Sequence, residues 1–106
     1  MEIVLGKYRS SGSQIFSDRD IGVQARAELG LDALENGSEE IKVIIPSDTW
    51  SVNSSFFGGL FEGSLKKMNK EEFLQKFRFV YNTGESLNPD LWENIEDDIQ
   101  YVINNL

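Results

Sequence analysis

Residues 41–67, IKVIIPSDTWSVNSSFFGGLFEGSLKK, decide the fold. They begin with the apolar run 41–45, which predicts a central strand buried on both faces of a sheet. Pro46 ends this strand because proline has no N–H to donate to a neighbouring strand. After a polar loop, an amphipathic helix is predicted, since large apolar residues recur on one face: Phe57, Leu60, Phe61, Leu65 and Met68.

The segments before this stretch also predict strands and a helix. Residues 2–8 are rich in β-branched residues and predict a strand, and residues 14–16 predict a short second strand. The composition of residues 9–13 predicts a turn. A helix is expected to begin after an N-cap at Ser17 and to end at Gly30 or soon after it.

The segments after it continue the alternation. Residues 70–76 predict one or two helical turns, and residues 77–81 predict an aromatic strand. Asn88 and Pro89 have the residue types preferred at the cap and first position of a helix. The order β-(β)-α-β-α-β-α predicts a single α/β domain over residues 1–106, with a small mixed sheet of about four strands and about three main helices.

The composition argues against catalysis. The 106 residues include no cysteine and no histidine, which excludes thiolate nucleophiles, imidazole bases and ordinary zinc sites. Glycine-rich phosphate loops and calcium-loop motifs are also absent from the sequence. We therefore expect a protein that is not an enzyme and has no cofactor. The sequence contains no signal-peptide pattern and no apolar run near the roughly 20 residues of a membrane helix, so a cytoplasmic location without membrane association is predicted.

The chain is strongly acidic. Its formal charge is −8, from 18 acidic and 10 basic side chains, which argues against direct binding to nucleic acid. Residues 85–106 have no basic side chain, and we interpret them either as a solvated surface or as a docking surface for a basic partner. The candidates for partner contact there are Glu93, Glu96 and Asp97.

A motif at the start of the second main helix carries a family resemblance. Asn53-Ser54-Ser55 follows a buried strand and opens a helix that contains Gly58 and Gly59. This arrangement resembles the STAS domain, the fold of anti-sigma factor antagonists, in which a strand is followed by Asp-Ser-Ser or Asp-Ser-Thr. The motif aspartate is Asn53 here, and the residue after the second serine is Phe56 instead of a small one.

The likeness is closer to the STAS-like family of unknown function, whose members show a Ser-Phe pair at this position. Ser55-Phe56 fits that pair, and Ser17-Asp18-Arg19 is similar to a Ser-Arg element of the family's first helix. Ile45-Pro46 replaces the Asp-Phe dipeptide that relatives have at the end of the central strand. The resemblance implies a STAS-like fold over most of the chain, although its specific motifs cover only about a quarter of it.

In the antagonists, the second motif serine is phosphorylated by the anti-sigma factor, a kinase with an ATP-binding fold. The resemblance therefore implies Ser55 as the phosphoacceptor, Ser54 as the neighbouring candidate, and an ATP-binding, kinase-like regulator as partner. A phosphate at a helix N-terminus would face free N–H groups and the positive end of the helix dipole. The alternative is that Asn53 or Ser54 simply caps the helix.

Four residues near this motif are further candidates for partner contact: Asp48, Trp50, Asn53 and Phe56. Trp50 is expected either as an exposed contact residue or as a lid over the core. Since two adjacent aromatic residues cannot both lie on one helical stripe, Phe56 is expected to point away from the core beside Ser55.

Three functions from different classes are compatible with these patterns. The first is a protein-binding STAS-like regulator that phosphorylation switches, and self-association is compatible with it. The second is an acidic inhibitor or immunity protein, for example from a phage, that blocks a basic nucleic-acid-binding partner. The third, an enzyme that uses Asp48 with Ser54 or Ser55, ranks last because no base of suitable pKa is evident beside a nucleophile.

Overall fold

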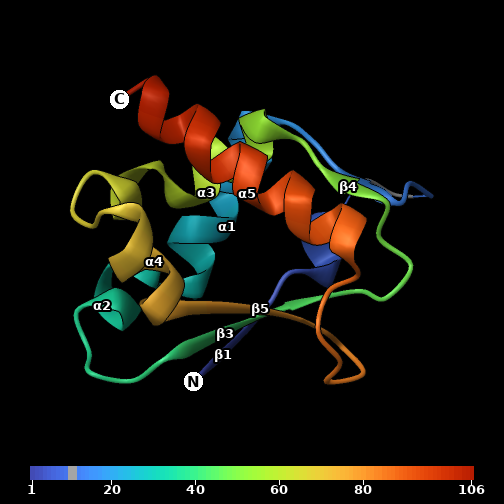
Figure 1. The fold of residues 1–106 in the computed structure, drawn as a ribbon, viewed down its shortest axis with the longest axis horizontal. Helices are drawn as coiled ribbons and strands as arrows, with labels where there is room; N and C mark the ends of the chain where they lie inside the picture. Colours follow the sequence, from blue (N-terminus) through green and yellow to red (C-terminus); the bar gives the residue numbers. More distant parts are fainter. Residues whose placement is uncertain (10–11) are drawn as a thin grey trace.

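The structure is a computed structural model that describes residues 1–9 and 12–106. The predicted turn at residues 9–13 therefore lies partly outside the described residues. The α/β class is confirmed: strands and helices alternate along the chain, and the helices gather on one side of the main sheet (Figure 1). None of the helices in residues 1–9 and 12–106 is long and apolar enough to cross a membrane.

The main sheet is three-stranded and parallel, in the order β1-β3-β5. In register, Ile3 lies beside Val43, and Val43 lies beside Phe79. The side chains of this row point toward the helices and are buried. The strands are β1 (Glu2–Val4), β3 (Ile41–Ile45) and β5 (Phe77–Tyr81).

The predicted single mixed sheet of about four strands is wrong. β2 (Ile15–Phe16) pairs with β4 (Ser51–Val52) in a separate two-stranded sheet, and all the strand pairs of the described residues are parallel. Backbone hydrogen bonds from Trp50 to Gln14 and from Asn53 to Phe16, each 2.8 Å, extend this second sheet. β4 was not predicted, because two residues in a polar loop give no period-2 pattern.

Strand β1 is shorter than predicted: Gly6–Tyr8 form a 3₁₀ turn, η1. In the β1–β3 pair, the backbone N–H of Lys42 donates to the carbonyl of Met1. The N–H groups of β3 that face β1 belong to every second residue, so the one after Ile44 would be that of residue 46. That residue is Pro46, which has no N–H. The carbonyl of Leu5 instead accepts from the N–H of Tyr8 at 2.9 Å, which turns the chain.

The helices begin and end close to the predicted residues. The first begins at Arg19, so its cap position falls on Asp18 and not on Ser17, and it ends at Gly30, whose φ is +65°. The predicted cap at Asn88 is confirmed, since its Oδ1 accepts from Leu91 N–H at 2.8 Å. The helices are α1 (Arg19–Leu29), α2 (Leu31–Glu35), α3 (Ser54–Leu65), α4 (Lys70–Lys76) and α5 (Pro89–Asn104).

Helix α3 lies at the centre of the core, in contact with α1, α4 and α5. It crosses α1 very closely, because a Cβ on Gly59 would lie 2.3 Å from the carbonyl oxygen of Arg19. The expectation that Phe56 points into solvent is wrong. Its side chain is fully buried, and its ring centroid lies 5.0 Å from that of Phe16. Because α1 and α5 both pack against α3, more than one side of α3 is buried.

The prediction that the central strand is buried on both faces is also wrong. Ile41, Val43 and Ile45 face the core, but Lys42 is exposed and Ile44 is only partly buried. The reason is tertiary: the helices cover only one face of the main sheet (Figure 1).

Candidate functional site

The first turn of α3 borders a hollow of about 140 Å³, which we call the α3 hollow. The start of α1, the start of α3 and the end of α5 meet there. It is lined by Arg19, Ser54, Ser55, Gly58, Glu62, Tyr101, Val102 and Asn105. The hollow thus contains both predicted phosphoacceptors.

Asn53 caps α3. Its Oδ1 accepts a hydrogen bond from the N–H of Ser55 at 2.7 Å, so the capping interpretation of Asn53 is confirmed. Ser55 is exposed and Ser54 is partly buried. Neither hydroxyl has a hydrogen-bond partner among the described residues, so both are free for an external group.

Arg19 lies over this first turn of α3. Its Nη1 atom is 3.1 Å from the position that a Cβ on Gly58 would take, so the glycine leaves room for the guanidinium. Gly58 lies three residues after Ser55 and therefore on the same side of the helix. The Nη2 atom of Arg19 pairs with Glu62, the carboxylate of the hollow.

The exposed surface of α5 leads toward the hollow. Asp90, Glu93 and Asp97, which we call the α5 acidic stripe, have the spacing i, i+3, i+7 and share one side of the helix. All are exposed, and none has an ion-pair partner among the described residues. Tyr101, four residues beyond Asp97, is 56% exposed and lines the hollow.

Two other acidic residues of α5 do not belong to the stripe. Glu96, a predicted contact residue, is partly buried, and its Oε2 lies 4.0 Å from Nζ of Lys70. Asp98 is buried, where desolvation and the neighbouring charge of Asp97 raise its pKa to about 7. Its Oδ2 accepts a hydrogen bond from Nδ2 of Asn94 at 3.2 Å.

Asn94 attaches β4 to α5. Its side chain accepts from the N–H of Val52 at 2.8 Å and donates to the carbonyl of Val52 at 3.0 Å. The loop that leads into β4 carries Trp50, which is 72% exposed, so the expectation of a lid over the core is wrong. Trp50 is available for contact, although it does not line the hollow.

Asp48 lies on the same loop and is exposed. Its Oδ1 accepts a hydrogen bond from Nη1 of Arg9 at 2.6 Å, and this bond lowers the pKa of Asp48. Like Trp50, it does not line the α3 hollow. Its carboxylate is already engaged by an arginine, and the predicted pairing of Asp48 with Ser54 or Ser55 is not seen among the residues of the hollow.

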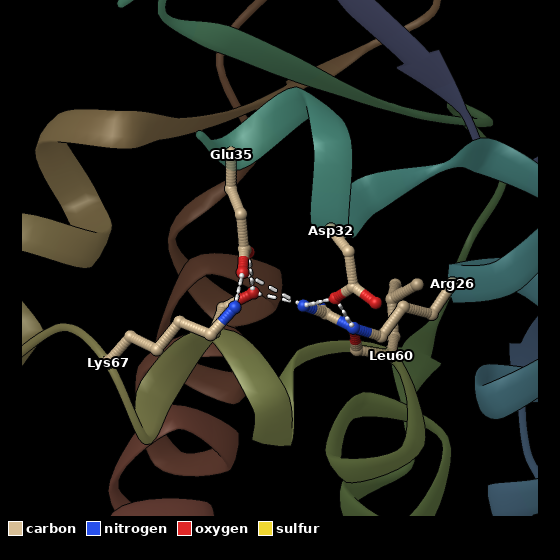
Figure 2. Close-up of polar contacts among 6 residues, drawn as sticks. Arg26, Asp32, Glu35, Leu60 and Lys67 are labelled. Atoms are coloured by element: carbon tan, nitrogen blue, oxygen red, sulfur yellow. Dashed lines mark hydrogen bonds and ion pairs between the residues drawn. The ribbon is translucent and has the colours of Figure 1, made fainter. Parts of the chain in front are cut away.

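Sequence reasoning missed a polar cluster that holds the other end of α3 (Figure 2). The Glu35 side chain is only 1% exposed, and its carboxylate accepts from Arg26 at 3.0 Å and from Lys67 at 3.1 Å. Ser64 also donates to it. Arg26 in turn donates to the carbonyl of Leu60 at 2.9 Å. We call this group the Arg26–Glu35 clamp; it joins α1, α2 and α3.

No local pattern predicts the clamp, because its members come from three helices that are separate in sequence. A second hollow, of about 370 Å³, lies between η1 and α1. Its main polar groups are already paired: Tyr8 donates to Glu28 at 2.7 Å, and Arg9 binds Asp48. The free hydroxyls of the α3 hollow make it the stronger candidate site.

The fold and the α3 hollow define a small α/β domain with a serine-bearing helix start beside an arginine. No family model, curated protein or solved structure matches the chain. Within residues 1–9 and 12–106, no group of three or more acidic side chains is placed to hold a metal ion.

Proposed function

We propose that this chain is a non-catalytic protein-binding module, a STAS-like regulator, whose partner surface comprises the α3 hollow and the α5 acidic stripe. The observation that carries the proposal is the pair of free hydroxyls of Ser54 and Ser55 at the start of α3 beside Arg19. The strand, loop and Asn-Ser-Ser helix start on an α/β domain support the STAS-like assignment.

Phosphorylation of Ser55 is the switch in this proposal. The phosphate would face those N–H groups of the first turn of α3 that Asn53 leaves free, where the helix dipole favours negative charge. Arg19 would then have a second anionic partner besides Glu62, and a guanidinium can bind phosphate in a bidentate manner. About two added negative charges beside Tyr101 would disrupt a partner that docks there.

The partner in this proposal is an ATP-binding, kinase-like regulator that binds the unmodified form. Tyr101 and Trp50 supply exposed aromatic surface, a residue type enriched at the centres of interfaces. The α5 acidic stripe would accelerate encounter with a basic surface on the partner.

The test compares three tagged proteins in host lysate: wild type, Ser55→Glu and Ser38→Glu. Ser38 is exposed and lies outside the α3 hollow, so its variant has the same charge change at a remote place. We expect wild type and Ser38→Glu to capture the same ATP-binding protein and Ser55→Glu to lose it. Equal capture by all three proteins would refute the switch. Phosphate mapped to Ser54 or Ser55 of the native protein would identify the acceptor.

A second function is favoured by one observation, the absence of ion-pair partners for the α5 acidic stripe among the described residues. It suits an acidic inhibitor that occupies the basic surface of a nucleic-acid-binding protein. Binding would then weaken steeply with salt and with Asp90→Asn, Glu93→Gln and Asp97→Asn combined, and would be indifferent to Ser55→Glu. Asp20→Asn, Glu40→Gln and Glu71→Gln combined are the matched control, since these exposed residues lie elsewhere. Binding that is insensitive to salt would exclude this function.

A further inference from the structure

Within residues 1–9 and 12–106, no helix covers the face of the main sheet opposite α1, α3 and α5 (Figure 1). Parallel strands in α/β proteins are usually buried on both faces. Here the outward side chains of β1, β3 and β5 line a shallow depression of about 220 Å³. We call this surface the open sheet face; its residues are Glu2, Val4, Lys42, Ile44, Arg78 and Val80.

The strand register arranges these six residues in two rows. Glu2, Lys42 and Arg78 are direct neighbours across the three strands and form a charged row. Two residues further along each strand, the apolar side chains form a second row: Val4, Ile44 and Val80.

The apolar row is accessible at Val4 and in part at Ile44. Val4 is 57% exposed and Ile44 is partly buried. Val80 is buried but lies apart from the main core cluster, because its side chain faces the other side of the sheet from Phe79. The loop with Asn82 and Gly84 borders the depression at the carboxyl ends of the strands.

The two cations of the charged row are unusual in this protein. Although the chain has 18 acidic side chains, neither Lys42 nor Arg78 has an ion pair or side-chain hydrogen bond to a described residue. Within that part of the chain, the one other basic residue without such a partner is Lys66. Glu2 lies beside Lys42 on the other strand but forms no ion pair with it. Lys42 and Arg78 are direct neighbours, so carboxylates from a partner would relieve their mutual repulsion.

We propose that the open sheet face is a docking site for an amphipathic helix of another protein, with apolar residues of that helix on Val4 and the exposed part of Ile44, and acidic residues beside Lys42 and Arg78. Such a helix supplies the second layer that a parallel sheet usually has. A second copy of this chain fits less well, because two open sheet faces would bring together four cations and only two carboxylates, those of Glu2. This surface lies opposite the helices that form the α3 hollow, so the proposal is independent of the function proposed above.

The experiment uses three synthetic helical peptides that share one leucine stripe and differ only in flanking residues: glutamate, glutamine or lysine. Each is titrated into the full ¹⁵N-labelled chain, and amide chemical shifts map the binding site. We expect shifts at Lys42, Ile44 and Arg78, with the glutamate peptide binding about tenfold more tightly than the lysine peptide.

Charge reversal is the decisive control. Arg78→Glu and Lys42→Glu should each weaken the binding of the glutamate peptide and strengthen the binding of the lysine peptide. Lys66→Glu makes the same change of net charge at the third unpaired cation and should change the binding of neither peptide. Circular dichroism and melting temperature establish that each variant is folded, and Arg78→Gln is the milder replacement should Arg78→Glu unfold.

Three results would overturn the proposal. The first is the absence of shifts on the open sheet face at millimolar peptide. The second is that Arg78→Glu and Lys66→Glu change the affinities of the peptides by the same amount. The third is a wild-type dimer by sedimentation that Arg78→Glu dissociates, because a second copy would then occupy the face.

Discussion

Asp98 shows how one residue of an acidic helix departs from its neighbours. Asp90, Glu93 and Asp97 face solvent, whereas Asp98 turns inward, is only 6% exposed and accepts a hydrogen bond from Asn94. Burial removes water that would stabilise its charge, and this desolvation, with the nearby charge of Asp97, raises its pKa to about 7. The carboxyl group is therefore a titrating element of the fold near neutral pH.

The raised pKa of Asp98 predicts a pH-dependent contribution to stability. In the unfolded chain the carboxyl loses its proton near its ordinary pKa of about 4, while the folded state keeps the proton up to about pH 7. The unfolded state therefore binds fewer protons between these values, and stability from this group is lost as the pH rises through that window. We expect the melting temperature of Asp98→Asn to equal that of wild type at pH 4 and to lie several degrees above it at pH 8.

The measurement is the melting temperature of both proteins from pH 4 to 8. Glu93→Gln, an exposed change of equal charge on the same helix, is the control and should differ from wild type by a nearly constant amount. A constant difference for Asp98→Asn as well would show that Asp98 ionises normally.

At the scale of elements, the small β2–β4 sheet depends on a side chain from outside it. Each of its strands has two residues, too few for an independently stable pair. Asn94 of α5 binds both the N–H and the carbonyl of Val52 and so replaces the next strand. This contact sets the path of the chain from Trp50 to the start of α3.

We predict that Asn94→Ala loosens this segment without unfolding the protein. Removal of the amide leaves the N–H of Val52 without its partner, so amide hydrogen exchange at Val52 should accelerate about tenfold or more. The amide of Val43 in the main sheet should keep its protection. Gln100→Ala, an exposed change on the same helix, should alter neither rate, and slow exchange at Val52 in Asn94→Ala would disprove the role given to Asn94.

At the scale of the whole molecule, the Arg26–Glu35 clamp joins three helices on the same side of the main sheet. Glu35 is buried and has three donors, while Asp32, which shares Arg26, has a side chain that is 80% exposed. Removal of one partner of a buried pair leaves the other charge uncompensated, whereas an exposed pair contributes little.

Glu35→Ala is therefore expected to lower the free energy of unfolding by about 3 kcal/mol, and Asp32→Ala by less than about 1 kcal/mol. Urea denaturation followed by tryptophan fluorescence measures both. The double variant Arg26→Met with Glu35→Leu should recover much of the loss, because it removes both charges together. Equal losses of unfolding free energy for Glu35→Ala and Asp32→Ala would show that burial does not determine how much each ion pair contributes to stability.

Much of the fold was predictable because its signals are local. Asn88 and Pro89 start α5 through backbone chemistry that involves only their neighbours, and the stripe of α3 follows from helical periodicity. Phe56, Lys42 and β4 were misassigned for the opposite reason. Their environments depend on which elements pack beside them, and no pattern within a helix or strand records that.

The candidate site divides in the same way. Asn53 as a cap, with Ser54 and Ser55 at the helix start, was expected from residue types, while Arg19 and Tyr101 come from distant segments. The amino-acid sequence by itself determined the α/β class, the positions of the main helices and the acidic surface, because these depend on local backbone preferences and on composition. Only the tertiary structure decided which face of the sheet stays open, which acidic side chain is buried and which groups surround Ser55, because each of these is a contact between residues far apart in the chain.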